Sequence, residues 1–454
     1  MSTYTAVTSA DREAMLSAIG AQDVEELFAG IPADLRLDHP LDLPPGQPEQ
    51  DVYTHLRGLA ARNVSTEDEL CFLGAGMYDH YVPAIVDMLM SRSEFLTPYT
   101  PYQPEVSQGG LQVMFEYQTA ISELTALPVA NASVYDGPSA VASAGYLARL
   151  ANGRTRFVVS AGLHPHALET LRTYAHGFGA SIAEVPLRDG RTDPEAWRAA
   201  LDGDTCAAFL QNPNFQGAVE DAEALAADAH AASPDAVVVG SYDPIALGIL
   251  RAPGECGVDV CVGEGQPLGN RLDFGGPSFG FFAATEAYLR RMPGRIAGET
   301  VDADGRRGFV LTLQTREQHI RREKATSNIC TAQALNALAG MIYLSWLGRR
   351  GLVELGELMI QRTAYARERL AGVDGIELLH EQPVVREFAL ALDAPVAAVI
   401  ERCAAAGVNP GFPLADDGLL VAITEQRSRA DIDRLAEVLG AAVAAERSGA
   451  GAVA

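Results

Sequence analysis

The spacing of apolar residues divides the chain into an N-terminal segment and a longer body. Residues 9–62 carry two helical patterns around a proline-rich stretch at residues 41–50, whose prolines favour an extended polyproline II conformation. We expect residues 1–62 to form a helical and extended strap across a larger body. A long helix is predicted from Ser107 to Thr125, because apolar residues recur there at helical spacing on one side.

The middle of the chain alternates between predicted strands and predicted helices. Short runs rich in β-branched and aromatic residues occur at residues 156–160, 181–187, 206–211, 236–243, 258–263 and 279–284. This alternation predicts a mostly parallel sheet with helices on both faces. We assign residues 63–325 to a large α/β domain, and residues 326–454 to connecting helices and a smaller α/β domain.

Composition describes a globular protein and excludes several classes of partner. The 454 residues are 48% apolar and 20% charged, and 34 Lys+Arg against 59 Asp+Glu give a net charge of −25. A sequence-independent grip on nucleic-acid phosphates needs the opposite charge, so no nucleic-acid partner is expected. The longest nearly apolar stretch, residues 335–348, is too short to span a bilayer, and the N-terminus lacks the features of a signal peptide. We therefore expect a cytoplasmic protein without a membrane partner.

Two common kinds of site are not favoured by the sequence. The six cysteines contain no CxxC pair and the nine histidines form no zinc-type cluster, so neither a metal site nor disulfides are expected. Residues 276–280 match the G-x-S-x-G pattern of serine hydrolases. A nucleophile elbow needs a strand before the serine and a helix after it, whereas Ser278 follows a loop and precedes a predicted strand.

Polar residues at the ends of the predicted parallel strands are the candidate site, because open α/β sheets bind ligands at that edge. Residues 131–138 (NASVYDGP), with Ser133 and Asp136, lead into a helix whose N–H groups either hold a phosphate or are simply capped. His164 follows one strand, where an imidazole stacks on an aromatic cofactor or serves the fold alone. Asn212 follows the next strand, and Asp243 ends another with a carboxylate suited to a pyridinium nitrogen.

In this order, the residues resemble the layout of fold-type I pyridoxal phosphate (PLP) enzymes, the aspartate aminotransferase superfamily. That layout implies a Schiff-base lysine one strand after the aspartate, where this sequence has Gln266. The only lysine of the chain, Lys324, lies far beyond that point in a predicted helix. Arginine cannot replace lysine in a Schiff base.

Longer stretches are similar to the first subunit of split, two-chain glycine decarboxylase, the P-protein of the glycine cleavage system. The likeness runs nearly end to end. It is carried by residues 74–83 (GAGMYDHYVP), 91–109 (SRSEFLTPYTPYQPEVSQG), 115–125, 131–137, 211–221, 292–331 and 423–427.

The resemblance implies a fold-type I PLP-dependent transferase with a smaller C-terminal α/β domain. It implies decarboxylation of glycine and transfer of the aminomethyl group to the lipoyl group of a carrier protein. PLP would be bound mainly by a homologous second subunit that supplies the lysine, and this chain would carry no covalent catalytic residue. Candidates for reaching the partner's active site are Tyr99, Tyr102, Gln103 and Glu105. Candidates for a vestigial cofactor pocket in this chain are Ser133, Asp136, His164, Asn212, Asp243 and Gln266.

Two alternatives belong to other functional classes. The first is a self-sufficient PLP enzyme that uses Lys324, against which Gln266 in the expected lysine position argues. The second is a purely structural or regulatory subunit. In that case residues 99–105 would only anchor a dimer interface, as buried tyrosines often do.

Overall fold

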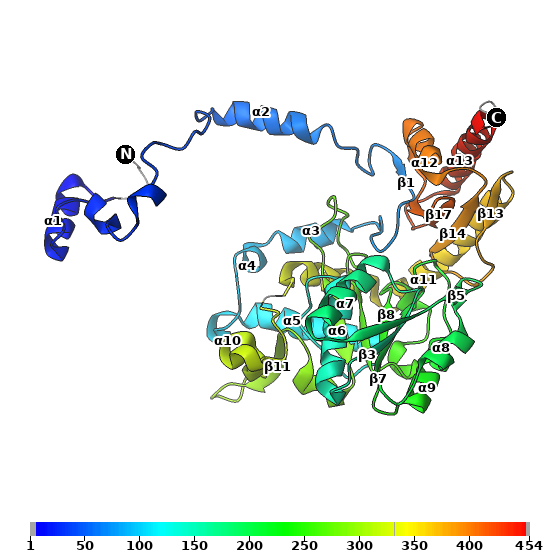
Figure 1. Cartoon of the computed structure of the whole chain (residues 1–454), viewed down its shortest axis with the longest axis horizontal. Helices are drawn as coiled ribbons and strands as arrows, with labels where there is room; N and C mark the ends of the chain where they lie inside the picture. Colours follow the sequence, from blue (N-terminus) through cyan, green and yellow to red (C-terminus); the bar gives the residue numbers. More distant parts are fainter. Residues whose placement is uncertain (1–5, 331, 451–454) are drawn as a thin grey trace. The chain divides into compact units, whose positions relative to one another are not determined.

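The computed structural model describes residues 6–330 and 332–450, so residues 1–5 of the expected strap, Thr331 and residues 451–454 lie outside the described residues. The chain divides into two units, Met1–Val64 and Ser65–Ala454 (Figure 1). Within the described ranges, no helix combines the length and apolar composition that a membrane span requires.

The first unit contains the two helices that the sequence predicts. They are α1 (Ser9–Ile19) and α2 (Glu49–Ala60), with short 3-10 helices η1 (Glu25–Phe28) and η2 (Ala33–Leu35) between them. A capping box between Thr8 and Asp11 begins α1, and Gly20 ends it in the left-handed conformation that glycine adopts without strain. None of these four helices buries a side chain.

The second unit is built around a seven-stranded sheet of order β2-β10-β9-β8-β7-β3-β4. The strands are β2 (Val129–Ala130), β3 (Arg156–Ser160), β4 (Ser181–Val185), β7 (Thr205–Asn212), β8 (Val237–Tyr242), β9 (Val260–Glu264) and β10 (Gly280–Ala284). Strands β9, β8, β7, β3 and β4 are parallel, and β10 runs antiparallel to both of its neighbours. The predicted mostly parallel sheet is therefore confirmed.

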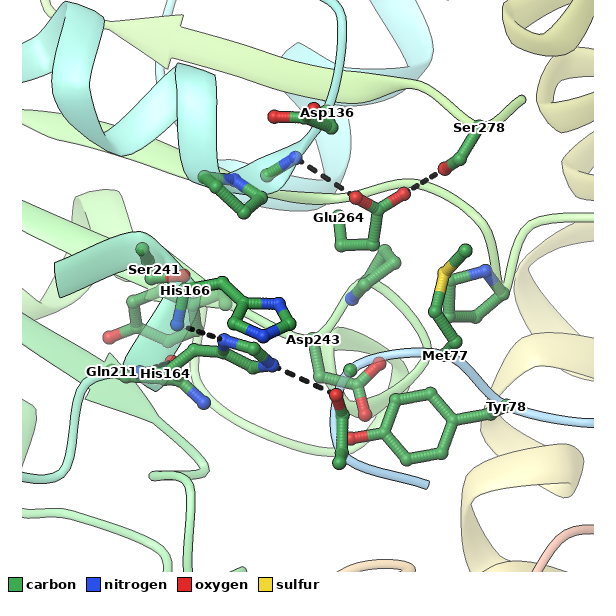
Figure 2. Close-up of a pocket in the computed structure, with 18 of the residues that line it drawn as sticks. Met77, Tyr78, Asp136, His164, His166, Gln211, Ser241, Asp243, Glu264 and Ser278 are labelled. Atoms are coloured by element: carbon green, nitrogen blue, oxygen red, sulfur yellow. Dashed lines mark hydrogen bonds between the residues drawn. The ribbon is translucent and has the colours of Figure 1, made fainter. Parts of the chain in front are cut away.

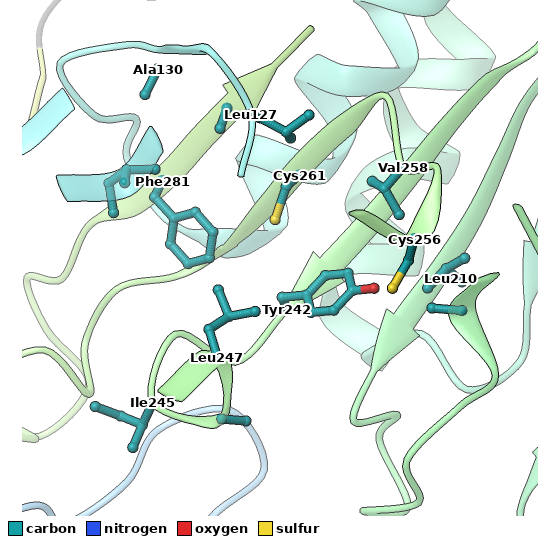
Figure 3. Close-up of a cluster of buried hydrophobic side chains, with 14 of the residues drawn as sticks. Leu127, Ala130, Leu210, Tyr242, Ile245, Leu247, Cys256, Val258, Cys261 and Phe281 are labelled. Carbon is teal, nitrogen blue, oxygen red and sulfur yellow. The ribbon is translucent and has the colours of Figure 1, made fainter. Parts of the chain in front are cut away.

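Helices cover both faces of this sheet, which explains why its strands are apolar at nearly every position. One core cluster contains residues of α5 (Gln108–Thr125), α8 (Pro194–Ala200) and α9 (Ala222–Ala232); Figure 3 shows part of it around Tyr242 and Phe281. The other contains residues of α6 (Gly137–Asn152) and α7 (Pro165–Gly177). Neighbouring strand residues such as Val158 and Val159 belong to different clusters, as the two-residue period of a strand requires.

A smaller α/β region follows α11 (Ala334–Ala371), a long helix interrupted at Gly348. Its antiparallel sheet has the order β13-β14-β17-β16. Its elements are β13 (Ile376–Leu378), β14 (Glu387–Leu392), α12 (Val396–Ala405), β15 (Val408–Asn409), β16 (Phe412–Leu414), β17 (Gly418–Ala422) and α13 (Arg429–Ala450). Strand β1 (Leu70–Cys71) pairs with β15, so the segment that begins the second unit is joined to this region.

Several shorter elements were not predicted from the sequence. The most prominent is the hairpin of β11 (Ile296–Val301) and β12 (Arg307–Thr312), which packs on α5. Lys324 ends a short 3-10 helix, η8 (Arg322–Lys324), well before α11 begins. The remaining elements are α3 (Ala84–Met90), α4 (Ser93–Leu96), η3 (Pro104–Val106), β5 (Leu187–Arg188), β6 (Arg191–Thr192), η4 (Ala246–Gly248), η5 (Pro253–Cys256), η6 (Glu286–Arg291), η7 (Gln314–Arg316) and α10 (Gln318–Arg321).

Candidate functional site

A cavity of about 540 Å³ lies at the carboxyl ends of β7, β8 and β9 (Figure 2). The large α/β region supplies most of its wall, and the beginning of β14 supplies the rest. Its polar lining residues are Tyr78, Tyr135, Asp136, His164, His166, Gln211, Asn214, Ser241, Tyr242, Asp243, Glu264, Ser278, Gln333, Arg386 and Glu387.

The structure brings only some of the candidate pocket residues to this cavity. Asp136, His164 and Asp243 line it, whereas Ser133, Asn212 and Gln266 do not. The Ser133 hydroxyl accepts a hydrogen bond from the backbone N–H of Gln333 at 3.1 Å. The Asn212 amide oxygen accepts one from the backbone N–H of Glu220 at 3.0 Å. Ser133 and Asn212 are thus engaged in holding neighbouring loops.

Asp136 caps helix α6 at the edge of the cavity. Its side chain accepts a hydrogen bond from the Ser139 backbone N–H at 2.7 Å. Its backbone carbonyl accepts one from the Ala140 N–H at 3.1 Å. The Ala140 bond is the first bond of the helix itself, whereas the Ser139 N–H is one of the free groups that a phosphate would need, and it is already paired.

Glu264, at the end of β9, occupies the remaining position at the start of α6. Its Oε2 accepts a hydrogen bond from the Gly137 N–H at 2.9 Å, and Pro138 has no N–H to offer. Its Oε1 accepts hydrogen bonds from the Gln266 N–H at 3.1 Å and from the Ser278 hydroxyl. Burial raises the pKa of this carboxyl to about 7. An internal acid thus lies where an anionic ligand group would bind.

His164 begins α7, and its ring is already engaged with the backbone. Its Nδ1 accepts a hydrogen bond from the His166 N–H at 3.1 Å, so Nε2 carries the ring proton and donates to the Ala75 carbonyl at 2.8 Å. Burial lowers the pKa of His164, which favours the neutral ring. A Cβ at Gly76 would lie 3.0 Å from Nε2. The segment around Gly76 therefore packs against the Nε2 edge of the imidazole and fixes the orientation of the ring.

Asp243 is paired with an arginine of the small α/β region. Its Oδ2 lies 2.7 Å from Nη2 of Arg386, and its Oδ1 accepts a hydrogen bond from the Ile245 N–H at 3.0 Å. Arg386 is buried, and its guanidinium carbon lies 3.4 Å from the centroid of the Tyr78 ring. A guanidinium thus pairs with the carboxylate that the sequence suggested for a pyridinium nitrogen.

Glu387 follows Arg386 and fixes the segment before α3. Its Oε1 accepts a hydrogen bond from the Ala75 N–H at 2.7 Å, and its Oε2 accepts one from the Tyr78 hydroxyl at 2.8 Å. Burial raises the pKa of Glu387 to about 7. A Cβ at Gly74 would lie 2.2 Å from its Oε1, so this approach requires glycine.

Gln266 is fully buried with its amide completely used. Its Oε1 accepts a hydrogen bond from the Tyr78 N–H at 2.8 Å, and its Nε2 donates to the carbonyls of Tyr78 at 3.0 Å and Asn270 at 2.9 Å. Tyr78 and Asn270 thus satisfy the amide, while the neighbouring cavity stays open.

These contacts test whether PLP fits this chain. PLP requires phosphate donors, a ring surface, a carboxylate for its ring nitrogen and a lysine. Here Glu264 pairs with the phosphate-type N–H of Gly137, Arg386 pairs with Asp243, and Gln266 stands in the expected lysine position. The residues present therefore do not fit PLP.

The four tyrosine-loop candidates lie outside the cavity. Tyr99, Tyr102, Gln103 and Glu105 are all exposed and do not line it. Sequence reasoning also missed Glu264, Arg386 and Glu387. Glu264 carried a usable signal, because it directly follows the strand predicted at residues 258–263 and lies two residues before Gln266. Arg386 and Glu387 carried no such signal, because they are distant in sequence from their partners. Arg386 meets Asp243, and Glu387 meets the segment of Tyr78, only in the folded chain.

Comparisons with known proteins agree with the resemblance seen in the sequence. A family profile described as glycine cleavage system P-protein matches residues 2–439. The chain is 49% identical, over 97% of its length and 100% of the relative, to the probable glycine dehydrogenase (decarboxylating) subunit 1 of Geotalea uraniireducens. A crystal structure of glycine decarboxylase (P-protein) of the glycine cleavage system in inhibitor-bound form superposes with a TM-score of 0.89 and 43% identity, covering 97% of this chain and 100% of that one.

A more distant neighbour bears on the fold alone. An aspartate aminotransferase from Thermus thermophilus, at 16% identity, superposes with a TM-score of 0.57 over 82% of this chain and 99% of its own. The predicted fold-type I architecture is thereby confirmed. With a family match that spans most of the sequence, the chain belongs to the glycine cleavage system P-protein family.

Proposed function

We propose that this chain is the non-lysine subunit of a two-chain glycine dehydrogenase (decarboxylating). A homologous second subunit would hold PLP and supply the Schiff-base lysine. Glycine would be the substrate, and the lipoyl group of a carrier protein would receive the aminomethyl group. The near full-length likeness to relatives named subunit 1 supports the assignment.

The observation that supports placing PLP on the second subunit is that side chains of this chain already occupy the positions that PLP would need. Glu264 accepts a hydrogen bond at the start of α6, and Arg386 forms an ion pair with Asp243. A phosphate and a pyridinium would therefore each have to displace a paired side chain. Lys324 does not line the cavity and is exposed at the end of η8. The self-sufficient alternative is therefore not favoured, and we place the covalent chemistry on the second subunit.

This chain's own contribution would come from its tyrosine loop, residues 97–106. Three prolines, Pro98, Pro101 and Pro104, stiffen the loop. Tyr99 is 86% exposed, and Leu96, Tyr102 and Val106 in the same stretch of chain are exposed as well; a grouping of exposed apolar side chains is typical of an interaction surface. We propose that the polar side chains of this loop, Tyr99, Tyr102, Gln103 and Glu105, enter the partner's active site and orient the substrate.

Reconstitution tests the proposal. The chain and its second subunit are purified separately, and exchange of labelled bicarbonate with the glycine carboxyl is measured with the lipoylated carrier. We expect exchange only from the mixture, and borohydride-trapped PLP only on the second subunit. Exchange by this chain alone, or a trapped adduct at Lys324, would contradict the proposal. Full exchange with alanine at all four loop positions would instead indicate a purely structural subunit.

A further inference from the structure

A second polar cluster lies under the tyrosine loop, away from the cavity. Tyr102 packs between two side chains from the segment after β10. The guanidinium carbon of Arg295 lies 5.1 Å from the centroid of the Tyr102 ring, and the His319 ring meets it edge-on at 5.6 Å. Arg295 also donates a hydrogen bond from Nη2 to the Tyr102 oxygen at 2.8 Å. These three contacts fix both the plane of the ring and the position of its oxygen.

The hydrogen bond from Arg295 determines what the Tyr102 hydroxyl can do. A guanidinium only donates, so it uses a lone pair of the phenolic oxygen and leaves the phenol's own proton free. No acceptor for that proton is present in the part of the chain that the structure describes. The ring is 43% exposed, so the O–H group can donate to an acceptor outside this chain. A cationic donor on the oxygen also polarises the O–H bond and strengthens that donation.

The base of the cluster is rigid but incompletely paired. Arg295 and Glu317 are 4% and 7% exposed, and their closest approach, Nε to Oε2, is 3.8 Å. Arg295 Nε and Glu317 Oε1 are buried without a hydrogen-bond partner among the described residues. A buried, loosely paired arginine is costly for stability alone. This cost suggests that its position under Tyr102 serves another purpose.

The backbone around Arg295 is held in place from several sides. Its carbonyl accepts a hydrogen bond from the Ala132 N–H at 2.8 Å. The Arg316 side chain donates to the Gly294 carbonyl at 3.1 Å. Gln108 joins the other end of the loop to β12, accepting from the Phe309 N–H and donating to its carbonyl, both at 2.9 Å. The loop, the hairpin and the 317–319 segment therefore form one connected surface.

We propose that Arg295 is a positioning residue that directs the Tyr102 hydroxyl at the carboxylate of an amino acid bound on the second subunit. His319 holds the ring, and Glu317 lies beside both Arg295 and His319. The inference rests on the proposed function. It adds that the Tyr102 hydroxyl is the group that binds the carboxylate and that Arg295 positions this hydroxyl. A carboxylate fits because the group that Tyr102 presents is a polarised hydrogen-bond donor.

The test uses the reconstituted two-subunit enzyme with Tyr102→Phe, Arg295→Lys and the double variant. Arg429 and Tyr365 provide a matched control, because the Arg429 guanidinium carbon lies 4.7 Å from the Tyr365 ring in the small α/β region. We expect each single variant to lower kcat/KM for glycine at least tenfold. The kcat/KM of the double variant should be no lower than that of the less active single variant, because the two residues act as a unit. Arg429→Lys and Tyr365→Phe should leave kcat/KM unchanged.

Complex formation, followed by size exclusion, separates this role from a structural one. The loss should appear in glycine kinetics while all variants still assemble with the second subunit. Additive losses, unchanged glycine kinetics, or failure of Arg295→Lys to assemble would each overturn the positioning role. An inactive wild-type complex would instead refute the proposed function itself.

Discussion

Restoring lysine at position 266 should not restore a PLP site. The variant Gln266→Lys supplies the Schiff-base amine but leaves Glu264 on the Gly137 N–H and Arg386 on Asp243. The new ammonium would also remove the three hydrogen bonds of the Gln266 amide. The pocket would therefore gain one group of the cofactor site while the others stay occupied.

The electrostatic cost can be worked from Glu264. Above its pKa of about 7 the carboxyl is ionised. A phosphate charge at about 4 Å, with an effective dielectric constant of about 20, is then repelled by about 4 kcal/mol. That energy weakens binding by about three orders of magnitude for each charge, since about 1.4 kcal/mol is tenfold. The penalty should decrease below pH 7, where Glu264 becomes neutral.

The assay is PLP titration at pH 8.5, followed by borohydride reduction and peptide mapping. We expect no stoichiometric adduct at position 266 in Gln266→Lys at PLP concentrations that saturate the second subunit. Adding Glu264→Ala should recover part of the lost affinity. Gln112→Lys, on the exposed face of α5, controls for aldimines formed by any surface lysine. Tight, stoichiometric labelling of Gln266→Lys alone would refute the reasoning.

Three further predictions concern stability. Burial raises the folded-state pKa of Glu387 to about 7, above its ordinary value of 4.5. The stabilising contribution of the neutral carboxyl to folding is therefore fully present below about pH 4.5 and is lost as pH rises through 7. Glu387→Gln should therefore be more stable than the wild type at pH 8.5, by at most about 3 kcal/mol, and this advantage should vanish near pH 5 in urea unfolding. Gln266→Ala leaves the Tyr78 N–H and the Asn270 carbonyl without their partner, while the Tyr78 carbonyl keeps the His80 N–H. The variant should cost about 2–4 kcal/mol in the same assay; a loss below 1 kcal/mol would contradict the buried geometry. PLP should not raise the Tm of the isolated chain, because a ligand stabilises only a fold that binds it; a dose-dependent rise would show that the cavity accepts PLP.

The sheet and part of the site could be predicted because both follow from local patterns. Apolar runs of strand length predicted six of the seven strands of the central sheet, and the sheet brings Asp136, His164 and Asp243 to one edge. The hairpin β11–β12 was missed because most of its residues are only partly buried or exposed, which weakens its alternation. Arg386 was missed because its partner, Asp243, lies in another part of the sequence. No one-dimensional pattern reports such a pair.

The internal pairings explain how the chain satisfies the polar groups around the cavity by itself. Without Glu264 and Arg386, the Gly137 N–H and Oδ2 of Asp243 would lose their partners, and each unmet buried partner costs about 1–3 kcal/mol. Glu264 and Arg386 satisfy these two groups from within the chain. The side chains of the tyrosine loop are not covered in this way by the described residues, since Tyr99 and Val106 are 86% and 80% exposed. The loop is thus the surface that gains most from a partner, because a second subunit there would bury these exposed side chains and accept a hydrogen bond from the Tyr102 hydroxyl.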